Sequence, residues 1–348
     1  MNQRRKSQAV RIGSVIVGGD TPVVVQSMTK TDTRDVKATM RQIDELADAG
    51  CEIVRLAVPD AEAATAFGQI KKQSSLPLVA DIHFDYRLAL TVLKEGADGL
   101  RINPGNIGSS ERVQAVVAAA KEREVPIRIG VNAGSLPANA SKDLPLAEQM
   151  AAAAMEHVAI LEALDYNLIK ISVKAFDVPQ TVVAYRIIAK KTPYPLHLGI
   201  TEAGLPTCGM IRSAVGIGAL LYLGIGDTIR VSLTGEPTEE VFAAYEILKS
   251  LNLRSRGATL VSCPTCGRTE ADVRHLAEVV SKEISSLDKP IKVAVMGCEV
   301  NGPGEAKDAD VGIACGKGRG VIFRKGKKVA VVEEKDFLDR LMQEINNL

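Results

Sequence analysis

Short apolar segments alternate with longer amphipathic segments from residue 23 to about residue 250. The apolar segments are rich in Val and Ile, which predicts strands, and a polar or Gly-bearing turn separates each from a helix-like segment of roughly 10 to 20 residues. Examples of these helix-like segments are 35–49, which Gly50 ends, and the Ala-rich 146–164, which Pro145 precedes. The pattern repeats eight times, with strands expected at residues 23–29, 53–58, 78–84, 99–104, 127–132, 168–174, 196–201 and 228–234.

Eight successive strand and helix units predict a barrel. Parallel strands joined by helices take right-handed crossovers, and eight is the number at which such a sheet closes into a (β/α)8 barrel. The alternative, an open doubly wound sheet, usually carries a glycine-rich cofactor turn after its first strand, whereas here that turn reads Met28-Thr29-Lys30-Thr31-Asp32. We therefore predict the α/β class and a TIM barrel over residues 1–251. A small hairpin over 10–17 is expected to close the bottom of the barrel.

The alternation ends after residue 251, and a second domain is expected over residues 252–348. Its first segment, 252–257, is polar and carries two arginines, which is typical of a linker. The rest combines strands and helices that would pack in two layers as a small α+β domain. The expected elements are strands at 259–262 and 291–296, helices at 270–284 and 335–345, and a hairpin over 311–332 that turns at Lys325-Gly326-Lys327.

Composition excludes several classes of partner. The 348 residues are 46% hydrophobic and 24% charged, as in ordinary globular proteins. With 43 Lys and Arg against 42 Asp and Glu, and with six Tyr, six Phe and no Trp, the chain lacks the positive charge and the stacking surface that nucleic-acid binding requires. No apolar run reaches the ~18 to 20 residues of a membrane span, and no apolar signal core follows the basic N-terminus. We therefore expect a cytoplasmic protein with reduced cysteines and without nucleic acid or membrane as a partner.

Charged side chains stand at the carboxyl ends of the predicted barrel strands, where the chemistry of this fold gathers. Strands buried on both faces are expected to be nearly all apolar, so these charges need an explanation. Cations crowded around one mouth repel each other unless an anion joins them, which predicts a ligand with phosphate or several carboxylate groups. For any single cation, pairing with a neighbouring carboxylate stays an alternative. The candidate residues are Arg55, Asp81, His83, Arg101, Asn103, Arg128, Asn132, Lys170, Ser172, Lys174, His197, Glu202, Arg230 and Ser232.

Three cysteines are expected to converge at one end of the second domain. Cys263 and Cys266 form a C-x-x-C turn between a strand and a helix, and Cys298 follows the next strand. Two alternatives stay open. A thioredoxin-type redox site also uses a C-x-x-C turn, although it needs no third cysteine, and a structural zinc site would need a fourth Cys or His ligand. Three thiolates suit an iron–sulfur cluster that keeps one iron for an exchangeable ligand. Glu305, after the bent turn Asn301-Gly302-Pro303-Gly304, is the natural fourth ligand.

Several segments together carry a resemblance to a known family. They include Gln26-Ser27-Met28-Thr29, Ala80-Asp81-Ile82-His83-Phe84, Arg101-Ile102-Asn103-Pro104-Gly105-Asn106, Gly199-Ile200-Thr201-Glu202-Ala203-Gly204, Ser262-Cys263-Pro264-Thr265-Cys266-Gly267 and Cys298-Glu299-Val300-Asn301-Gly302-Pro303-Gly304-Glu305. On these segments the chain resembles the bacterial 4-hydroxy-3-methylbut-2-en-1-yl diphosphate synthases of the non-mevalonate isoprenoid pathway. The resemblance runs over essentially the whole chain, and the two cysteine motifs together are its most specific part.

The resemblance implies a TIM barrel and a small domain similar to that of sulfite reductases, with a [4Fe–4S] cluster on Cys263, Cys266, Cys298 and Glu305. It implies that 2-C-methyl-D-erythritol 2,4-cyclodiphosphate is converted to the linear allylic diphosphate, with ferredoxin or flavodoxin as the electron donor. It also implies a head-to-tail homodimer, in which the cluster domain of one chain covers the barrel mouth of the other. Within such a site, Glu202 and His83 are our candidates for proton delivery, and Glu305 for the ligand that the substrate displaces.

Two other functions stay open on the sequence alone. A zinc-stabilised phosphate-binding protein would hold diphosphates without turnover. A barrel aldolase would use Lys170 or Lys174 as a Schiff base and would tolerate the loss of Cys263. Iron content and the activity of a Cys298→Ser variant separate all three.

Overall fold

Parallel strands form the sheet of the first compact unit, Met1–Arg254, in this computed structural model. The structure describes residues 3–102, 107, 109–136, 143–285, 287, 289–298 and 302–348. The strands are β3 Val24–Met28, β4 Ile53–Ala57, β5 Leu78–Asp81, β6 Gly99–Ile102, β7 Ile127–Asn132, β8 Ile169–Lys174, β9 His197–Leu198 and β10 Thr228–Ile229. Their order is β8-β7-β6-β5-β4-β3-β10-β9, and a parallel bridge from Ile171 to Leu196 links β8 to the residue before β9. The sheet is therefore a nearly closed barrel, which confirms the predicted α/β class and TIM-like fold.

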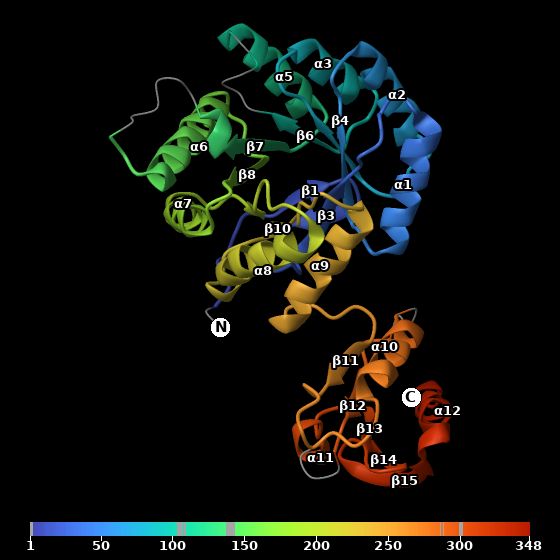
Figure 1. Ribbon diagram of the computed structural model, residues 1–348. Helices are drawn as coiled ribbons and strands as arrows, with labels where there is room; N and C mark the ends of the chain where they lie inside the picture. Colours follow the sequence, from blue (N-terminus) through green and yellow to red (C-terminus); the bar gives the residue numbers. More distant parts are fainter. Residues whose placement is uncertain are drawn as a thin grey trace. The chain divides into compact units, whose positions relative to one another are not determined.

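Helices surround the barrel strands (Figure 1). Several helices begin at an Asp whose side chain accepts a hydrogen bond from a backbone N–H three residues on, such as Asp35 from Ala38 and Asp177 from Gln180. None of the helices in the described ranges is long and apolar enough to cross a membrane. Their bounds are α1 Val36–Asp48, α2 Ala61–Lys71, α3 Tyr86–Lys94, α5 Ser110–Glu122, α6 Leu146–Ala163, α7 Val178–Lys191, α8 Pro206–Tyr222 and α9 Pro237–Ser250, with a 3-10 turn at Ala133–Ser135.

Three strands end at least three residues earlier than the sequence predicts, and one of them is β5, which stops at Asp81 where the pattern predicts a strand to residue 84. The other two are β9 and β10. β9 stops at Leu198 and β10 at Ile229, whereas the apolar pattern predicts strands to residues 201 and 234. After β9, Glu202 takes a positive φ of 57°, which a strand does not accommodate. After β10, the N–H of Leu233 donates to the carboxylate of Glu240 at 3.0 Å and so does not pair with a neighbouring strand. Both segments therefore leave the sheet as loops at its carboxyl end.

A hairpin of β1 (Val10–Ile12) and β2 (Val15–Val17) covers the amino-terminal end of the barrel, as predicted. Val10, Ile12 and Val17 of this hairpin are buried against residues at or near the starts of β3, β4 and β5. The buried cluster comprises Val10, Ile12, Val17, Val24, Ile53 and Val79. Because this end is apolar and closed to water, the polar chemistry of the barrel lies at the opposite end.

The second compact unit, Ser255–Leu348, contains a five-stranded mixed sheet. Its strands are β11 Thr259–Ser262, β12 Lys292–Met296, β13 Val311–Cys315, β14 Arg319–Arg324 and β15 Lys327–Glu333, and its helices are α10 Val273–Ile284, α11 Gly302–Glu305 and α12 Phe337–Asn346, with a 3-10 turn at Glu334–Asp336. The first three strands pair in parallel, and the last two extend the sheet antiparallel. Val280 of α10, Leu341 of α12 and Ile313 of β13 share one core. This arrangement confirms the expected α+β domain, and its likeness to sulfite reductases stays a prediction.

The segment 311–332 holds three strands, whereas the sequence predicted a single hairpin. A first reversal lies between β13 and β14, where Gly318 has a φ of 73°. The predicted turn follows, with positive φ at both Lys325 and Gly326, as a type I′ turn requires. The first turn was missed because the glycines of 316–320 fit the interior of one long hairpin as well as a separate turn.

Candidate active site

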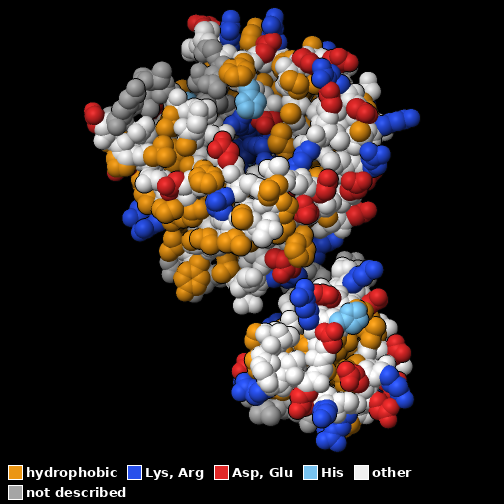
Figure 2. Space-filling model, viewed as in Figure 1, with side chains coloured by type: hydrophobic (Ala, Val, Ile, Leu, Met, Phe, Trp, Pro, Cys, Tyr) orange, Lys and Arg blue, Asp and Glu red, His pale blue; other side chains and the backbone are white. Residues whose placement is uncertain are grey.

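A polar cavity of about 220 Å3 opens at the carboxyl ends of the barrel strands. Figure 2 shows a hollow on this unit in which Lys and Arg side chains gather. The lining residues come from β4 to β8 and from the loops that follow β5, β9 and β10. They are Arg55, Asp81, His83, Arg101, Arg128, Asn132, Ser172, Lys174, Thr201, Arg230 and Ser232. The structure thus brings together most of the residues that the sequence placed at the strand ends, and it adds Thr201.

Asp81 is a buried carboxylate of the cavity that holds two of its cations. Its Oδ1 lies 3.1 Å from Arg101 Nη1, and its Oδ2 lies 3.6 Å from Arg55 Nε. His83 Nε2 lies 3.6 Å from Oδ1. Burial alone would raise the pKa of the Asp81 carboxyl, but Arg55, the hydrogen bond with His83, and Arg101 together hold this pKa well below its usual range. Asp81 is therefore ionised, and Arg55 and Arg101 are paired cations.

Arg128 and Lys174 are buried cations whose contacts in the described part of the chain are with neutral groups or with none. Arg128 is 2% exposed, and its Nε and Nη2 have no hydrogen-bond partner there. Lys174 is 6% exposed, and its Nζ lies 3.3 Å from His197 Nε2. Burial, followed by repulsion from neighbouring cations, lowers the pKa of both side chains. Asp81 attracts Arg128 but pairs with Arg55 and Arg101, so these two buried side chains contact no carboxylate among the described residues and mark the place for an anion.

Lys170 and His197 lie in the barrel interior and are not among the residues that line the cavity. Lys170 Nζ is 3.5 Å from Gln26 Oε1, and His197 Nδ1 is 2.7 Å from Thr228 Oγ1. Burial and the nearby Lys174 lower the pKa of His197, so its ring is neutral at pH 7. Contact of Lys170 and His197 with a substrate stays a prediction.

Two glycines let the cations fold across the strands. A Cβ at Gly130 would lie 2.6 Å from Arg101 Nε, and a Cβ at Gly199 would lie 2.6 Å from Lys174 Nζ. A side chain at either position would therefore displace a cation from the cavity.

Of three further residues that the sequence predicts in the site, one lines the cavity, one does not, and one lies outside the described residues. His83 lines the cavity and its side chain is 53% exposed. Glu202 is exposed in the loop after β9 and does not line the cavity. Asn103 lies outside the residues that the structure describes. Their roles in proton delivery and substrate binding stay predictions.

Glu240 is a second buried carboxylate that the sequence analysis did not single out. It is 1% exposed in α9, and its Oε2 lies 3.3 Å from Arg230 Nη2. The sequence does contain one sign of this burial, because Glu240 lies at four-residue spacing with Ala244 and Leu248 on the buried face of the helix. An acidic residue in such a stripe indicates a buried partner of opposite charge.

The cysteine motifs of the second unit stand at the carboxyl ends of two neighbouring parallel strands. Cys263 directly follows β11, and Cys298 follows β12 by two residues. The N–H of Gly297 donates to Cys263 Sγ at 3.2 Å. Cys266 and Glu305 are exposed.

The donor set fits an iron–sulfur cluster by its chemistry. Three thiols lie in the loops that follow β11 and β12, and the carboxylate is that of Glu305, the last residue of α11. Residues 299–301, between Cys298 and Glu305, lie outside the described ranges. Among the described residues, no three Cys, His, Asp or Glu side chains are grouped closely enough to hold a metal ion. The N–H donor at Cys263 Sγ is the observation that favours thiolate ligation.

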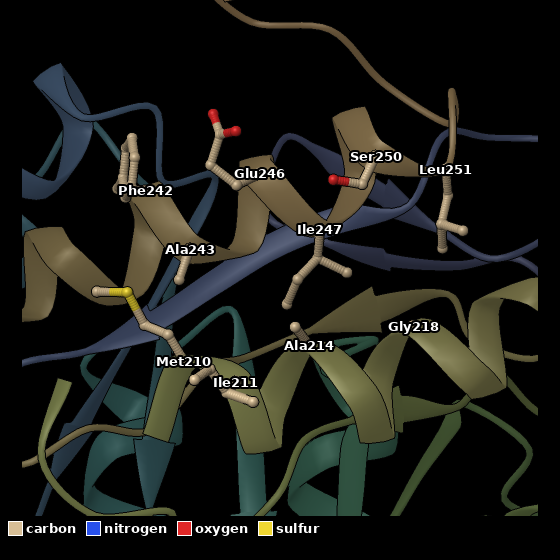
Figure 3. Close-up of a pocket in the computed structure, with 10 residues that line it drawn as sticks. All are labelled: Met210, Ile211, Ala214, Gly218, Phe242, Ala243, Glu246, Ile247, Ser250 and Leu251. Carbon is tan, nitrogen blue, oxygen red and sulfur yellow. The ribbon is translucent and has the colours of Figure 1, made fainter. Parts of the chain in front are cut away.

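An apolar cavity of about 330 Å3 lies between α8 and α9 (Figure 3). Residues that line it include Met210, Ile211, Ala214, Phe242 and Ile247. The one ionisable side chain drawn in Figure 3, Glu246, is acidic and would repel an anion. The barrel cavity, although smaller, is therefore the candidate active site.

Comparison with solved structures supports the barrel fold. The chain is similar to a dihydropteroate synthase of Yersinia pestis, with a TM-score of 0.52 and 10% identity over 70% of this chain and 98% of that chain. It is also similar to a 3-dehydroquinate dehydratase of Geobacillus kaustophilus, with a TM-score of 0.51 and 14% identity over 71% of this chain and 98% of that chain. At these identities the similarity shows the fold alone.

Sequence comparison covers both units. Residues 7–245 match the family model described as the GcpE TIM-barrel domain, and residues 259–347 match the GcpE protein C-terminal domain. The chain is 64% identical over 348 residues, the whole of both chains, to a Dehalococcoides mccartyi protein named 4-hydroxy-3-methylbut-2-en-1-yl diphosphate synthase (flavodoxin). It is 58% identical over 347 residues to a Geobacter sulfurreducens protein of the same name, covering 99% of this chain and 98% of the relative. This chain therefore belongs to the GcpE family.

Proposed function

We propose that this chain catalyses the reductive ring opening and dehydration of 2-C-methyl-D-erythritol 2,4-cyclodiphosphate to 4-hydroxy-3-methylbut-2-en-1-yl diphosphate, with two electrons from a flavodoxin. The relatives carry the name of this product and of this donor. The observation that carries the proposal is the cationic cavity, in which buried Arg128 and Lys174 contact no carboxylate among the described residues. Two linked phosphates supply the negative charge that this cavity lacks.

The barrel residues divide into those that bind charge and those that orient the substrate. Nε and Nη2 of Arg128 have no hydrogen-bond partner among the described residues and are suited to bind a phosphate as a planar fork, while Lys174 adds a point charge beside it. Arg55 and Arg101 are held in direction by Asp81 and can contact the same anion without moving. Asn132, Ser172 and Ser232 line the same cavity with neutral hydrogen-bonding groups, which suit the sugar-derived hydroxyls.

The second unit would hold a [4Fe–4S] cluster on Cys263, Cys266, Cys298 and Glu305. When bound, this group supplies electrons one at a time and Lewis acidity toward an oxygen. The Gly297 N–H donates to Cys263 Sγ, and hydrogen bonds to the ligand sulfurs are one means by which a protein tunes such a cluster. Reduced thiols agree with the cytoplasmic location that the sequence predicts.

His83 and Glu202 are the proposed proton donors for the departing hydroxyl. His83 lines the cavity, where its Nε2 lies 3.6 Å from Asp81 Oδ1 and 3.0 Å from Arg101 Nη1. Its half-exposed side chain can take a proton from water and give it to an oxygen within the cavity. Glu202 does not line the cavity, and its proposed role is supported by its position one residue after Thr201, which does.

Anaerobic purification tests this function. We expect a brown protein with about four irons per chain, a paramagnetic signal after reduction, and turnover of the cyclic diphosphate with reduced flavodoxin. Cys298→Ser should lose activity, and Lys170→Met should leave the cluster signal intact. A colourless zinc protein would support the phosphate-binding alternative, and a Cys298→Ser protein with full activity would favour the aldolase alternative.

We also propose that the chain forms a homodimer. Support comes from the outer face of α8 and α9, where Ile211, Val215 and Phe242 are 63%, 58% and 60% exposed around the apolar cavity of Figure 3. Apart from Glu246, the residues that line this cavity carry no charge, and a mainly apolar face can pack on a second copy of itself, as a twofold interface requires. Light scattering should give twice the chain mass of 37.1 kDa, and Phe242→Lys should give a monomer. A monomeric wild-type protein would refute this part of the proposal.

A further inference from the structure

Glu240 is a buried carboxylate beside the cavity to which the proposed function gives no role. Its Oε1 accepts a hydrogen bond from Leu233 N at 3.0 Å and lies 3.1 Å from Lys30 Nζ, and its Oε2 accepts one from Ser27 Oγ at 3.2 Å. Arg230 Nη2 contacts both oxygens, at 3.4 and 3.3 Å. One side chain of α9 thus ties the helix to the carboxyl ends of β3 and β10, which are neighbours in the barrel.

Lys30 offsets most of the negative charge of Glu240. Its Nζ also donates to the backbone carbonyls of Leu233, at 2.9 Å, and Gly235, so the ammonium group is fixed beside the carboxylate. Because the two charges nearly cancel at a distance, Glu240 repels an anion in the cavity only weakly. The main effect of Glu240 on the cavity is therefore on the direction of Arg230.

Arg230 needs an anchor in order to point into the cavity. Its side chain is 15% exposed, and its Nε forms no hydrogen bond within the described ranges. Arg55 repels it, and Asp81 is already engaged by Arg55 and Arg101. Without Glu240 the guanidinium group would turn toward solvent, and ordering it again on binding would weaken affinity by up to about tenfold.

We propose that Glu240 is a positioning residue that aims Arg230 at the phosphate groups of the substrate and acts on the reaction only through Arg230. This inference rests on the proposed function, in which the cavity binds a diphosphate. A purely structural Glu240 would instead stabilise α9 and the two strands, and its loss would harm the enzyme whether or not Arg230 is present.

A double-mutant cycle on the holoenzyme separates these two roles. We expect Glu240→Gln to lower kcat/KM about tenfold, mainly through a higher KM, and to change it less than about twofold in an Arg230→Met background. Glu45→Gln on α1 is the control, because the Glu45 carboxylate pairs only with exposed Arg41 among the contacts described here, and it should leave kcat/KM unchanged. Equal losses from Glu240→Gln in the two backgrounds, or a lower KM, would overturn the proposal.

Binding of inorganic pyrophosphate tests the role of Glu240 without the reaction. It can be measured by calorimetry on the same full-length proteins. Glu240→Gln should weaken pyrophosphate about tenfold only where Arg230 is present. If the wild-type protein does not convert the cyclic diphosphate, the proposed function fails while the pyrophosphate cycle still tests Glu240. Glu240→Asp keeps the charge but shortens its reach, and it replaces Glu240→Gln if that variant does not fold. A loss from Glu240→Asp that persists without Arg230 would equally overturn the proposal.

Discussion

Replacing Asp81 by Asn removes the buried charge that holds two guanidinium groups together. The side chains of Asp81 and Arg101 are each 7% exposed, and that of Arg55 is 12% exposed. Breaking a buried ion pair at one partner typically destabilises a protein by about 3 to 5 kcal/mol, because the remaining charge is left uncompensated. Asn keeps one oxygen that can accept from Arg101 Nη1, so we expect a loss of about 3 kcal/mol, at the lower end of this range.

An anion should restore part of this stability. Pyrophosphate at 100 times its Kd stabilises a folded protein by about 2.7 kcal/mol. Because Asp81→Asn raises the net positive charge of the cavity, its Kd for pyrophosphate should be lower than that of the wild type. The variant should therefore gain more stability than the wild type at the same pyrophosphate concentration.

Urea unfolding followed by tyrosine fluorescence measures this effect in the barrel alone. The chain has six Tyr and no Trp, and every Tyr lies within Met1–Arg254. The matched control is Asp32→Asn, which breaks an exposed pair with Arg34 at 2.7 Å. This pair is shorter than either contact of Asp81, yet its loss should be undetectable because water screens it.

Two results would refute this reasoning. The first is an Asp81→Asn loss below about 1 kcal/mol, which would mean that the two arginines are not desolvated. The second is equal stabilisation of wild type and variant by pyrophosphate, which would mean that the anion does not bind beside Asp81.

Three further predictions follow from the same cavity. Gly199→Ala places a Cβ 2.6 Å from Lys174 Nζ and 2.7 Å from the backbone oxygen of Arg230, so it should lower the unfolding free energy by about 1 to 3 kcal/mol and weaken pyrophosphate binding in calorimetry. Gly218→Ala in α8 meets no atom within 4 Å and should instead raise the unfolding free energy by about 0.5 to 1 kcal/mol in the same urea assay; a loss would contradict the open space there. Burial holds the pKa of His197 below its unfolded value near 6.5, so below that pH the unfolded chain binds a proton that the folded chain does not. The stability of the wild type should therefore fall by up to about 1.4 kcal/mol per pH unit as pH drops from about 6.5, and His197→Gln should reduce this slope; unchanged slopes in urea titrations at pH 7 and 5.5 would contradict it.

The sequence predicted the barrel and the position of its cavity because both follow from periodic patterns. Alternating strands and helices predict parallel strands, and the carboxyl ends of parallel strands converge, which places Arg55, Asp81 and Arg101 together. Which charges pair could not be predicted, because this depends on the strand register that sets Asp81 opposite Arg101. Glu240 was missed for a related reason, since its partners come from segments more than 200 residues earlier and from the loop after β10. A local sequence pattern can show that Glu240 is buried, but it does not show which distant residues contact it.

The hairpin of β1 and β2 has a kinetic consequence. Its buried valines and isoleucine fill the amino-terminal end of the barrel, and a diphosphate cannot cross that apolar layer. Reactant and product must then enter and leave through the same opening, at the carboxyl ends of the strands. Product that lingers there excludes the next reactant, so inhibition by product or by pyrophosphate should be competitive with the cyclic reactant.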